Sequence, residues 1–428
     1  MNLLEKIRTS RTYCDGGMGT LLQARGMGAG DSPELWNLHH PNDLTEIHRS
    51  YYDAGADVVV ANSFGANPLK LTAECTVEET VSAAIQNLRA ARDGAGHGYI
   101  ALDVGPTARL LAPLGDLDFD DALAAFRTMI EAGVKAGVDL ISVETMTDLY
   151  ELKAAVLAAR ECCDLPVVAS VAFDGNGRLL TGADAAATVS LLEGLGVAAL
   201  GINCGVGPVQ AADTARTLLA LSSTPVLLKP NAGLPCTENG CLHYDINAEQ
   251  FAAAIAPLAA EGVRLVGGCC GTTPEHIAAL RKACDDIVPA PIVPKDYIFI
   301  SSGLLALDTR TLDLSSITPI AVPDDADDLL DEAFDRKDEE EPVLRLDFSS
   351  GDGLSPVEAV DAIQAVLRLP LWLEGADAAS LLPALRRVNG KAMVTVPDGD
   401  PELLALLHRF GGVAYNPQTG TLTDCKRT

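Results

Sequence analysis

The sequence predicts a (β/α)8 TIM barrel followed by a smaller α/β domain that resembles part of a second barrel. In roughly the first 270 residues, short apolar runs rich in β-branched residues alternate with segments of helical periodicity. The runs number eight, which is the strand count of a TIM barrel. The predicted strands are residues 11–14, 57–61, 99–104, 140–143, 166–172, 198–202, 225–229 and 264–266.

The intervening segments are predicted to be helices that pack outside the parallel sheet. Leu44, Ile47 and Tyr51, for example, lie at positions i, i+3 and i+7, which places them on one helix face. The last barrel helix is expected to begin after Thr273, an N-cap residue that is followed by proline. We expect the barrel to end near Cys284.

The composition excludes several classes of protein. The chain has 428 residues, a formal net charge of −28 and 48% hydrophobic residues, without an apolar run long enough to cross a membrane. The acidity argues against nucleic acid or an anionic membrane surface as a partner. The start of the chain is too charged for a signal peptide, and the eleven cysteines are widely spread, so we expect a cytoplasmic protein with reduced cysteines.

Two changes of composition suggest the domain boundaries. Residues 289–294 read Pro-Ala-Pro-Ile-Val-Pro, which favours extended backbone. Eleven of the eighteen residues from Asp324 to Glu341 are acidic, which predicts an exposed or partly disordered connector or, alternatively, an acidic docking surface. We therefore expect a barrel over 1–290, a linker region over 291–341 and a small α/β domain over 342–428. The strands expected in that domain are residues 343–347, 371–374 and 392–396.

Polar residues and glycines follow the predicted strands, where the active site of a barrel forms. Reactive side chains in TIM barrels come from the carboxyl ends of strands, so residues far apart in the sequence meet there. The candidates are Asp15, Gly16, Gly17 and Met18 after the first strand, Asn62 and Ser63 after the second, Glu144 after the fourth, Asn203 and Cys204 after the sixth, Asn231 after the seventh, and Cys269 and Cys270 after the eighth.

Cys204, Cys269 and Cys270 are the predicted ligands of a zinc ion. Glycines flank them, which permits unusual backbone geometry, and they lie on two strand ends that one strand separates. Three protein ligands leave a fourth position open, and zinc held by three thiolates suits the binding of a substrate thiol as a nucleophilic thiolate. Asn231 either fills the fourth position at rest or makes a hydrogen bond within its loop. Small apolar core side chains are expected instead at Cys75, Cys162, Cys163, Cys236, Cys241, Cys284 and Cys425.

These motifs resemble the homocysteine S-methyltransferase family, most closely the homocysteine-binding module of cobalamin-dependent methionine synthases. The resemblance covers about residues 1–294 and rests on Asp15–Thr20, Asn62–Asn67, Asp103–Thr107, Glu144–Met146 and Gly267–His276. It implies an enzyme in which the three cysteines hold Zn²⁺ and the sulfur of homocysteine becomes the fourth ligand.

The resemblance also implies roles for the other candidate residues. The acids that match Asp15 and Glu144 lie near the substrate ammonium, which agrees with the rule that buried carboxylates need a cation. An alternative for Asp15 is that it caps its own turn. Backbone N–H groups of the glycine turn would bind the substrate carboxylate. The expected substrate site therefore consists of Asp15, Gly16, Gly17, Met18, Asn62, Ser63, Glu144, Asn203 and Asn231.

The second domain resembles pieces of the pterin-binding barrel of methionine synthases, at residues 298–302 and 343–415. Where that family has Asp and Asn side chains at strand ends, this sequence has Asp347-Phe348-Ser349, Leu373-Glu374-Gly375 and Thr395-Val396-Pro397. We therefore expect a degenerate domain that has lost folate binding. No cobalamin-binding motif follows, so a corrinoid would arrive on another protein.

The implied activity is that of a homocysteine S-methyltransferase (EC 2.1.1) that forms methionine. The favoured donor is methylcobalamin on a separate corrinoid protein, and the alternatives are S-methylmethionine, betaine and methyltetrahydrofolate. The aromatic content of 4% argues against an aromatic cage for betaine. An alternative of another class is a non-catalytic docking subunit for a corrinoid protein. A homodimer would cover an exposed sheet edge of the second domain.

Overall fold

The computed structural model describes residues 2–28, 30–238 and 241–427, and of residues 236–238 and 241–243 it describes the backbone alone. The chain divides into two compact units. The first consists of residues 1–109, 120–180 and 197–294, and the second of residues 110–119, 181–196 and 295–428. The second unit therefore includes helix α8 (Ala185–Gly194) in addition to the C-terminal third of the chain.

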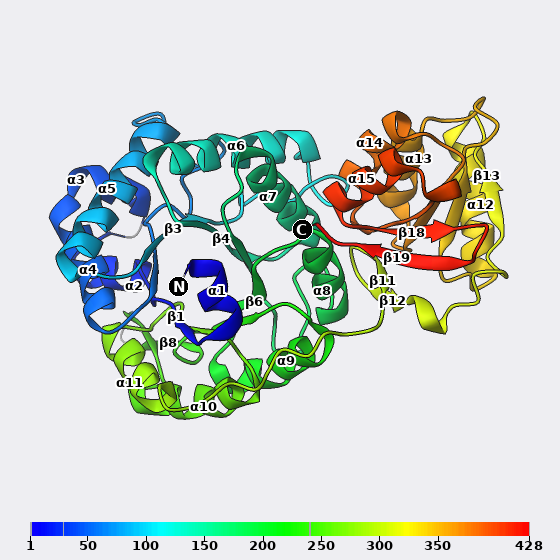
Figure 1. Cartoon of the computed structure of the whole chain (residues 1–428). Coiled ribbons are helices and arrows are strands. Elements are labelled where there is room, and N and C mark those ends of the chain that lie inside the picture. Colours follow the sequence, from blue (N-terminus) through cyan, green and yellow to red (C-terminus); the bar gives the residue numbers. More distant parts are fainter. Residues whose placement is uncertain (1, 29, 239–240, 428) are drawn as a thin grey trace. The chain divides into compact units, whose positions relative to one another are not determined.

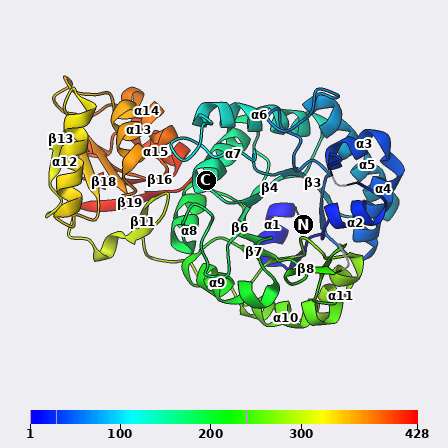
Figure 2. The same cartoon turned by 180° about the vertical axis from the view of Figure 1, so that it is seen from behind.

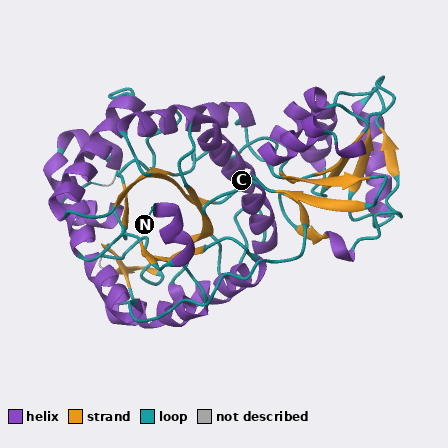
Figure 3. Ribbon diagram, in the orientation of Figure 1, coloured by secondary structure: helices purple, strands orange, loops and turns teal. Residues whose placement is uncertain are grey.

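The first unit contains an eight-stranded parallel sheet that closes into a barrel (Figure 3). Its strands are β1 (Thr12–Tyr13), β2 (Val58–Val60), β3 (Tyr99–Val104), β4 (Leu140–Met146), β5 (Val167–Val171), β6 (Ala199–Asn203), β7 (Val226–Lys229) and β10 (Leu265–Val266). The sheet order is β1-β10-β7-β6-β5-β4-β3-β2, and a parallel bridge between Cys14 and Val58 closes the ring. The predicted TIM barrel is confirmed.

Helices surround the ring of strands in both views of the molecule (Figures 1 and 2). They are α4 (Pro41–Asp53), α5 (Val77–Ala95), α6 (Phe119–Ala136), α7 (Leu149–Cys162), α9 (Pro208–Leu221), α10 (Ala248–Glu261) and α11 (Pro274–Cys284). Thr273 is the N-cap of α11, as the sequence predicts. The connection from β1 to α4 adds α2 (Gly19–Ala24), η1 (Pro33–Leu35) and α3 (Trp36–His39). Within the described residues, no helix is both long and apolar enough to cross a membrane.

A short helix, α1 (Leu3–Thr9), fills the amino-terminal end of the barrel. Leu3 and Ile7 are buried in one apolar cluster with strand residues such as Val58, Leu140 and Leu227. Figure 1 shows this helix inside the ring of strands. Helix α1 closes this end with apolar side chains. Because the strands are parallel, the polar residues at their carboxyl ends gather at the opposite end of the barrel.

The second unit contains two sheets. Its strands are β11 (Phe299–Ser302), β12 (Ala306–Asp308), β13 (Pro319–Ala321), β14 (Leu344–Asp347), β15 (Leu371–Glu374), β16 (Gly390–Lys391), β17 (Met393–Thr395), β18 (Gly412–Asn416) and β19 (Thr421–Cys425). The larger sheet has the order β13-β14-β15-β17-β18-β19 and is parallel except for the β18–β19 pair. The smaller sheet, β12-β11-β16, is antiparallel. The helices α12 (Ala326–Asp338), α13 (Pro356–Val366), α14 (Ala378–Arg387) and α15 (Pro401–Phe410) complete the unit.

Most of the acidic segment forms an ordered helix, α12, so the expectation of a partly disordered connector there is wrong. The boundaries of the linker region at residues 291 and 341 stay a prediction. Leu329 and Ala333 on α12 are fully buried, so one turn of apolar side chains anchors an otherwise acidic helix. Asp325 caps the first turn by accepting from two backbone N–H groups, and basic residues occupy the last turn. The prediction from composition overlooked that Leu329 and Ala333 lie at i and i+4, on one face of a helix that can pack against the unit.

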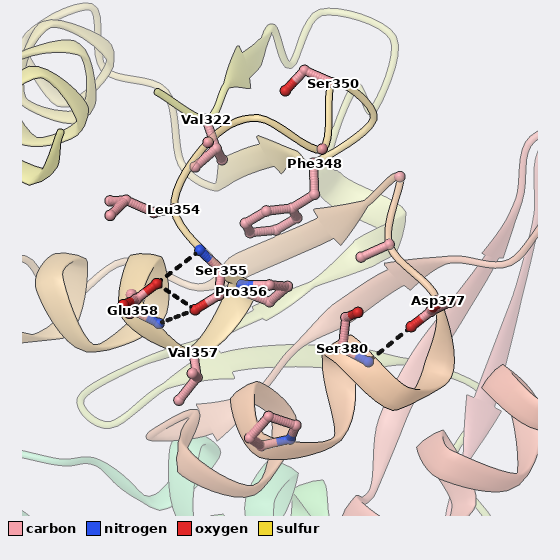
Figure 4. A pocket seen from close by; sticks show the side chains of 15 residues that line it. Val322, Phe348, Ser350, Leu354, Ser355, Pro356, Val357, Glu358, Asp377 and Ser380 are labelled. Carbon is pink, nitrogen blue, oxygen red and sulfur yellow. Dashed lines mark hydrogen bonds between the residues drawn. The ribbon is translucent and has the colours of Figure 1, made fainter. Parts of the chain in front are cut away.

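A cavity of about 600 Å³ lies at the carboxyl ends of β13, β14 and β15 (Figure 4). Phe348 and Val322 form part of its apolar wall. The carboxylate of Glu358 accepts from the Ser355 backbone N–H and hydroxyl, and Asp377 caps α14. The acidic side chains of the cavity are thus already occupied by helix caps, and its lining residues include no lysine or arginine.

Candidate active site

The three cysteines predicted to hold a metal lie together. Cys204 follows β6, and Cys269 and Cys270 follow β10, with β7 between these strands in the sheet. Their Sγ atoms all lie within 4.8 Å of one another, and those of Cys204 and Cys270 are 3.9 Å apart. Zinc–sulfur bonds of about 2.3 Å in tetrahedral geometry place sulfurs about 3.8 Å apart, so the three side chains fit a zinc ion.

Backbone contacts between strand ends fix these cysteines. Cys204 has a φ of 59°, a left-handed conformation that is uncommon outside glycine and that clusters at functional sites. Its N–H donates to the carbonyl of Lys229 at 3.1 Å, and the N–H of Cys269 donates to the carbonyl of Pro230 at 2.9 Å. The loops after β6 and β10 are therefore both attached to the end of β7.

The three thiols are linked by hydrogen bonds. Bonds with Cys204 and Cys270 raise the pKa of Cys269, and bonds from Cys204 and Cys269 lower the pKa of Cys270. A hairpin, β8 (Pro235–Glu238) and β9 (Cys241–Tyr244), follows β7, and Tyr244 at its end interacts electrostatically with Cys270. A dication bound here would replace the shared protons and hold all three sulfurs as thiolates.

Two asparagines organise the loops around the cysteines. The Oδ1 of Asn203 accepts from the Thr145 N–H at 2.7 Å and from the Ser170 hydroxyl at 2.8 Å. The Oδ1 of Asn231 accepts from the Cys270 N–H at 3.1 Å. This bond joins the loop after β7 to the loop after β10, and the role of Asn231 as a resting zinc ligand stays a prediction. Direct contact of either asparagine with a substrate stays a prediction.

A buried group of three carboxylates and one lysine lies at the same end of the barrel. The Nζ of Lys229 is 2.8 and 3.1 Å from the two carboxylate oxygens of Glu144 and 3.3 Å from the Oδ1 of Asp15. Asp103, near the end of β3, is buried and interacts electrostatically with all three, and its Oδ1 has no hydrogen-bond partner. We call Asp15, Asp103, Glu144 and Lys229 the acid cluster.

The acid cluster carries more negative than positive charge. With every group ionised, three carboxylates against one ammonium give a net charge of −2. Burial raises the pKa of Asp15 to about 6 and raises the pKa of Asp103 well above its usual value. Burial alone would lower the pKa of Lys229, but Glu144 and Asp15 raise it well above its usual value. The cluster therefore suits a further cation.

The sequence prediction missed two members of this cluster. It identified Asp15 and Glu144 but not Lys229, which ends an apolar strand, or Asp103, which is the second-last residue of one. The position of Asp103 at the end of a predicted strand was a usable signal. The alternative that Asp15 caps its own turn is not what the structure shows, because its Oδ2 accepts from the Val60 N–H at 2.8 Å on the neighbouring strand.

The glycine turn after β1 packs tightly against the loop after β10. The N–H of Gly17 donates to the carbonyl and hydroxyl oxygens of Thr272, at 3.2 and 3.1 Å. The Gly17 N–H thus already has partners on Thr272, and its binding of a substrate carboxylate stays a prediction. A Cβ on Gly16 would lie 2.5 Å from the Thr272 hydroxyl oxygen, which explains the need for glycine. For Gly16 and Met18 the carboxylate-binding role stays a prediction.

Asn62 and Ser63 have structural contacts. The amide of Asn62 donates to the carbonyl of Pro33 at 2.6 Å, and the fully buried hydroxyl of Ser63 donates to the carbonyl of Asp103 at 2.9 Å. Ser63 thereby joins the ends of β2 and β3 and helps to position Asp103. Substrate contact by Asn62 or Ser63 stays a prediction.

The other cysteines differ in burial. Cys284 and Cys425 are buried, as expected of core residues, but Cys75, Cys162 and Cys163 are only partly buried. The side chains of Cys236 and Cys241 lie outside the described residues. Among the described cysteines, only the trio after β6 and β10 forms a group with metal-ligand spacing.

Comparison with known proteins gives consistent matches. Residues 12–284 match the family described as Homocysteine S-methyltransferase. Similar curated proteins are the methionine synthases of Mycobacterium tuberculosis and Mycobacterium leprae, which are 31% and 30% identical over 93% of this chain. This chain spans 37% of the length of each.

Solved structures with a similar fold include the homocysteine methyltransferase MmuM from Escherichia coli. Its metallated form aligns with a TM-score of 0.54 and 28% identity, over 64% of this chain and 96% of that one. Its apo form aligns with a TM-score of 0.53 and 27% identity, over 66% of this chain and 98% of that one.

Proposed function

This chain belongs to the homocysteine S-methyltransferase family, and on that premise we propose that it transfers a methyl group to the thiol of homocysteine and forms methionine. One observation carries the proposal: the cysteine trio and the acid cluster occupy adjoining strand ends. The Gly268 N–H, for example, donates to the carbonyl of Asp15 at 2.9 Å. The trio suits a thiol bound through a metal, the acid cluster suits an α-ammonium, and homocysteine has both groups.

Cys204, Cys269 and Cys270 would hold the zinc ion. Bound zinc stabilises a substrate thiol as a thiolate at neutral pH. The chain contributes by holding the three sulfurs close together before a ligand arrives, through the left-handed backbone of Cys204 and the hydrogen bond from the Cys270 N–H to Asn231. Such preorganisation lowers the cost of forming the site.

The acid cluster would bind the ammonium and so orient the amino acid. Asp103 has a carboxylate oxygen without a hydrogen-bond partner, and Asp15 and Glu144 present further acceptors. With the ammonium bound at the acid cluster and the thiol directed to the trio, the homocysteine sulfur would be oriented to attack the methyl carbon in line with its bond to the carrier. A sulfur–carbon bond would form, the bond to the carrier would break with its electron pair left on the carrier, and the thiol proton would be released to solvent.

We propose a methyl-corrinoid on a separate protein as the donor. The polar side chains at the strand ends of the second unit support this, because they bond one another instead of pointing into free space. Glu374 accepts two hydrogen bonds from Arg345, both at 2.8 Å, and one from Thr395 at 3.1 Å. The Oδ1 of Asp347 accepts from both the N–H and the hydroxyl of Ser349. These contacts leave few groups to grip the polar edge of a pterin.

We also propose a division of the chain into two domains and a cellular compartment. Residues 1–290 would form the homocysteine-binding barrel, and residues 342–428 a domain that does not bind folate. We place the protein in the cytoplasm, because the nine described cysteines are all free thiols and a reducing compartment would keep them so.

The test is methionine formation by the zinc-loaded protein with homocysteine and free methylcobalamin. We expect turnover in the wild type and none in Cys270→Ala, with Cys162→Ala as the control for loss of a thiol outside the trio. Turnover only with S-methylmethionine, betaine or methyltetrahydrofolate would keep the acceptor half of the proposal and reject the corrinoid. A protein that binds zinc and a corrinoid protein but turns over no donor would instead be a docking subunit.

A further inference from the structure

Lys229 occupies the place between two carboxylates that are expected to bind the substrate ammonium. Its side chain is 3% exposed, and its Nζ lies within 3.3 Å of three carboxylate oxygens, two on Glu144 and one on Asp15. The Nζ donates hydrogen bonds to both oxygens of Glu144 and forms an ion pair with Asp15. Lys229 is therefore directed at the acids.

The remaining contacts fix the geometry of the two acids. The Ser142 hydroxyl donates to the Oε1 of Glu144 at 2.8 Å, and the Val60 N–H donates to the Oδ2 of Asp15 at 2.8 Å. Each carboxylate thus contacts Lys229 and one further group. For Glu144 that group is on its own strand, and for Asp15 it is on the adjacent strand. Asp15 and Asp103 each keep one carboxylate oxygen without a hydrogen bond, but that of Asp15 is ion-paired with Lys229.

Lys229 either competes with the substrate ammonium for the two acids or supports the site that binds it. If Lys229 competed with the substrate for the acids, removing its charge would strengthen binding of an ammonium. If Lys229 supports the site, removing it would leave three buried carboxylates without a counter-ion, which costs several kcal/mol in proteins. They would then take up protons or shift apart, and both changes weaken an ammonium site.

We propose that Lys229 is a positioning residue that holds Asp15 and Glu144 as an oriented, ionised pair, so that one monocation binds at the acid cluster beside Asp103. Lys229 acts through the acids and does not touch the reacting atoms. It sets specificity, because the cluster with Lys229 accepts a thiol that has an α-ammonium in preference to one that lacks it. This inference rests on the proposed function, since homocysteine is the ligand.

The experiment measures binding by calorimetry on the zinc-loaded full-length protein, which needs no methyl donor. The ligands are homocysteine and 4-mercaptobutyrate, which has the thiol and the carboxylate but no ammonium. In Lys229→Met we expect the Kd of homocysteine to rise about tenfold or more, while zinc content and the Kd of 4-mercaptobutyrate stay close to wild type. Lys153→Met is the matched control, because Lys153 is also a buried lysine of the barrel but lies on α7.

A double variant keeps the test decisive if Lys229→Met does not fold. Lys229→Met with Glu144→Gln removes one positive and one negative charge, so the net charge of the cluster stays at −2. We expect it to fold, to bind zinc, and to prefer homocysteine over 4-mercaptobutyrate more than Lys229→Met does. If the single variant cannot be obtained, we expect the double variant to prefer homocysteine less strongly than Lys153→Met does.

The outcomes separate the inference from the proposed function. Tighter homocysteine binding by Lys229→Met, or an equal loss for both ligands, would overturn the positioning role while leaving a homocysteine-binding wild type intact. A wild type that binds zinc but not homocysteine would overturn the proposed function itself, and the role of Lys229 with it.

Discussion

The replacement of Gly201 by alanine tests how closely the two strands that support the site are packed. Gly201 lies on β6, three residues before Cys204, and pairs with Leu227 on β7. A Cβ on Gly201 would lie 2.0 Å from the carbonyl oxygen of Leu227 and 2.7 Å from its carbonyl carbon. Both atoms belong to the backbone, so no side-chain rotation relieves the overlap.

The size of the effect follows from these distances. Ordinary contact begins at 3.4 Å, so the strands must separate by about 1.4 Å at this point. Overpacking of this kind costs about 1–3 kcal/mol of unfolding free energy. Because β6 leads into Cys204 and β7 ends at Lys229, we also expect zinc affinity to fall by about tenfold, as happens when the supports of metal ligands are disturbed.

The assay compares Gly201→Ala with Gly175→Ala by urea denaturation and by zinc competition with a chelator. Gly175 has open space around its Cβ position and an ordinary backbone conformation, so the same chemical change should be nearly neutral there. If both variants unfold at the same urea concentration and bind zinc equally, the close approach of β6 and β7 is not what positions Cys204, and the reasoning fails.

Three further predictions address the site and the second unit. Because the pKa of Asp15 is raised to about 6, its carboxylate takes up a proton below that pH; homocysteine affinity measured from pH 5 to 8 should fall on the acid side, and Asp15→Asn should reduce this dependence without abolishing it, since the pKa of Asp103 is raised as well. Cys270→Ala leaves two of three thiolates and should lower zinc affinity by about 100-fold or more in a chelator competition, whereas Cys162→Ala should match wild type. Trp372, 1% exposed, lies in the core of the second unit beside Tyr415; Trp372→Ala should cost about 3–5 kcal/mol in the urea transition of that unit, and a cost below about 1 kcal/mol would contradict its role as a core residue.

The barrel could be predicted from the sequence because its signal is local. Strands buried on both faces appear as apolar runs, and each predicted run overlaps an observed strand. The cysteine trio could be predicted for the same reason, since Cys204 and Cys269 each follow such a run and are flanked by glycine. Both inferences need only the order of residues along the chain and the rule that barrel sites form at strand ends.

The parts that could not be predicted depend on partners far away in the sequence. Lys229 belongs to the site only because Asp15 and Glu144, 214 and 85 residues earlier, meet it in space. The hydrogen bond from the Gly17 N–H to Thr272, 255 residues later, likewise has no signal in the local sequence. Helix α12 was not predicted because the acidic composition describes the segment as a whole. Packing of the helix depends instead on the positions of Leu329 and Ala333 within it. The net charge of a segment does not indicate which distant residues its side chains will contact.

The most direct test of the account is the number of sulfur ligands at zinc, measured by X-ray absorption on the zinc-loaded protein before and after homocysteine is added. We expect three sulfurs from Cys204, Cys269 and Cys270, and a fourth when homocysteine binds. Zinc held with fewer than three sulfurs, or a sulfur count unchanged at saturating homocysteine, would contradict the claim that this site activates the homocysteine thiol.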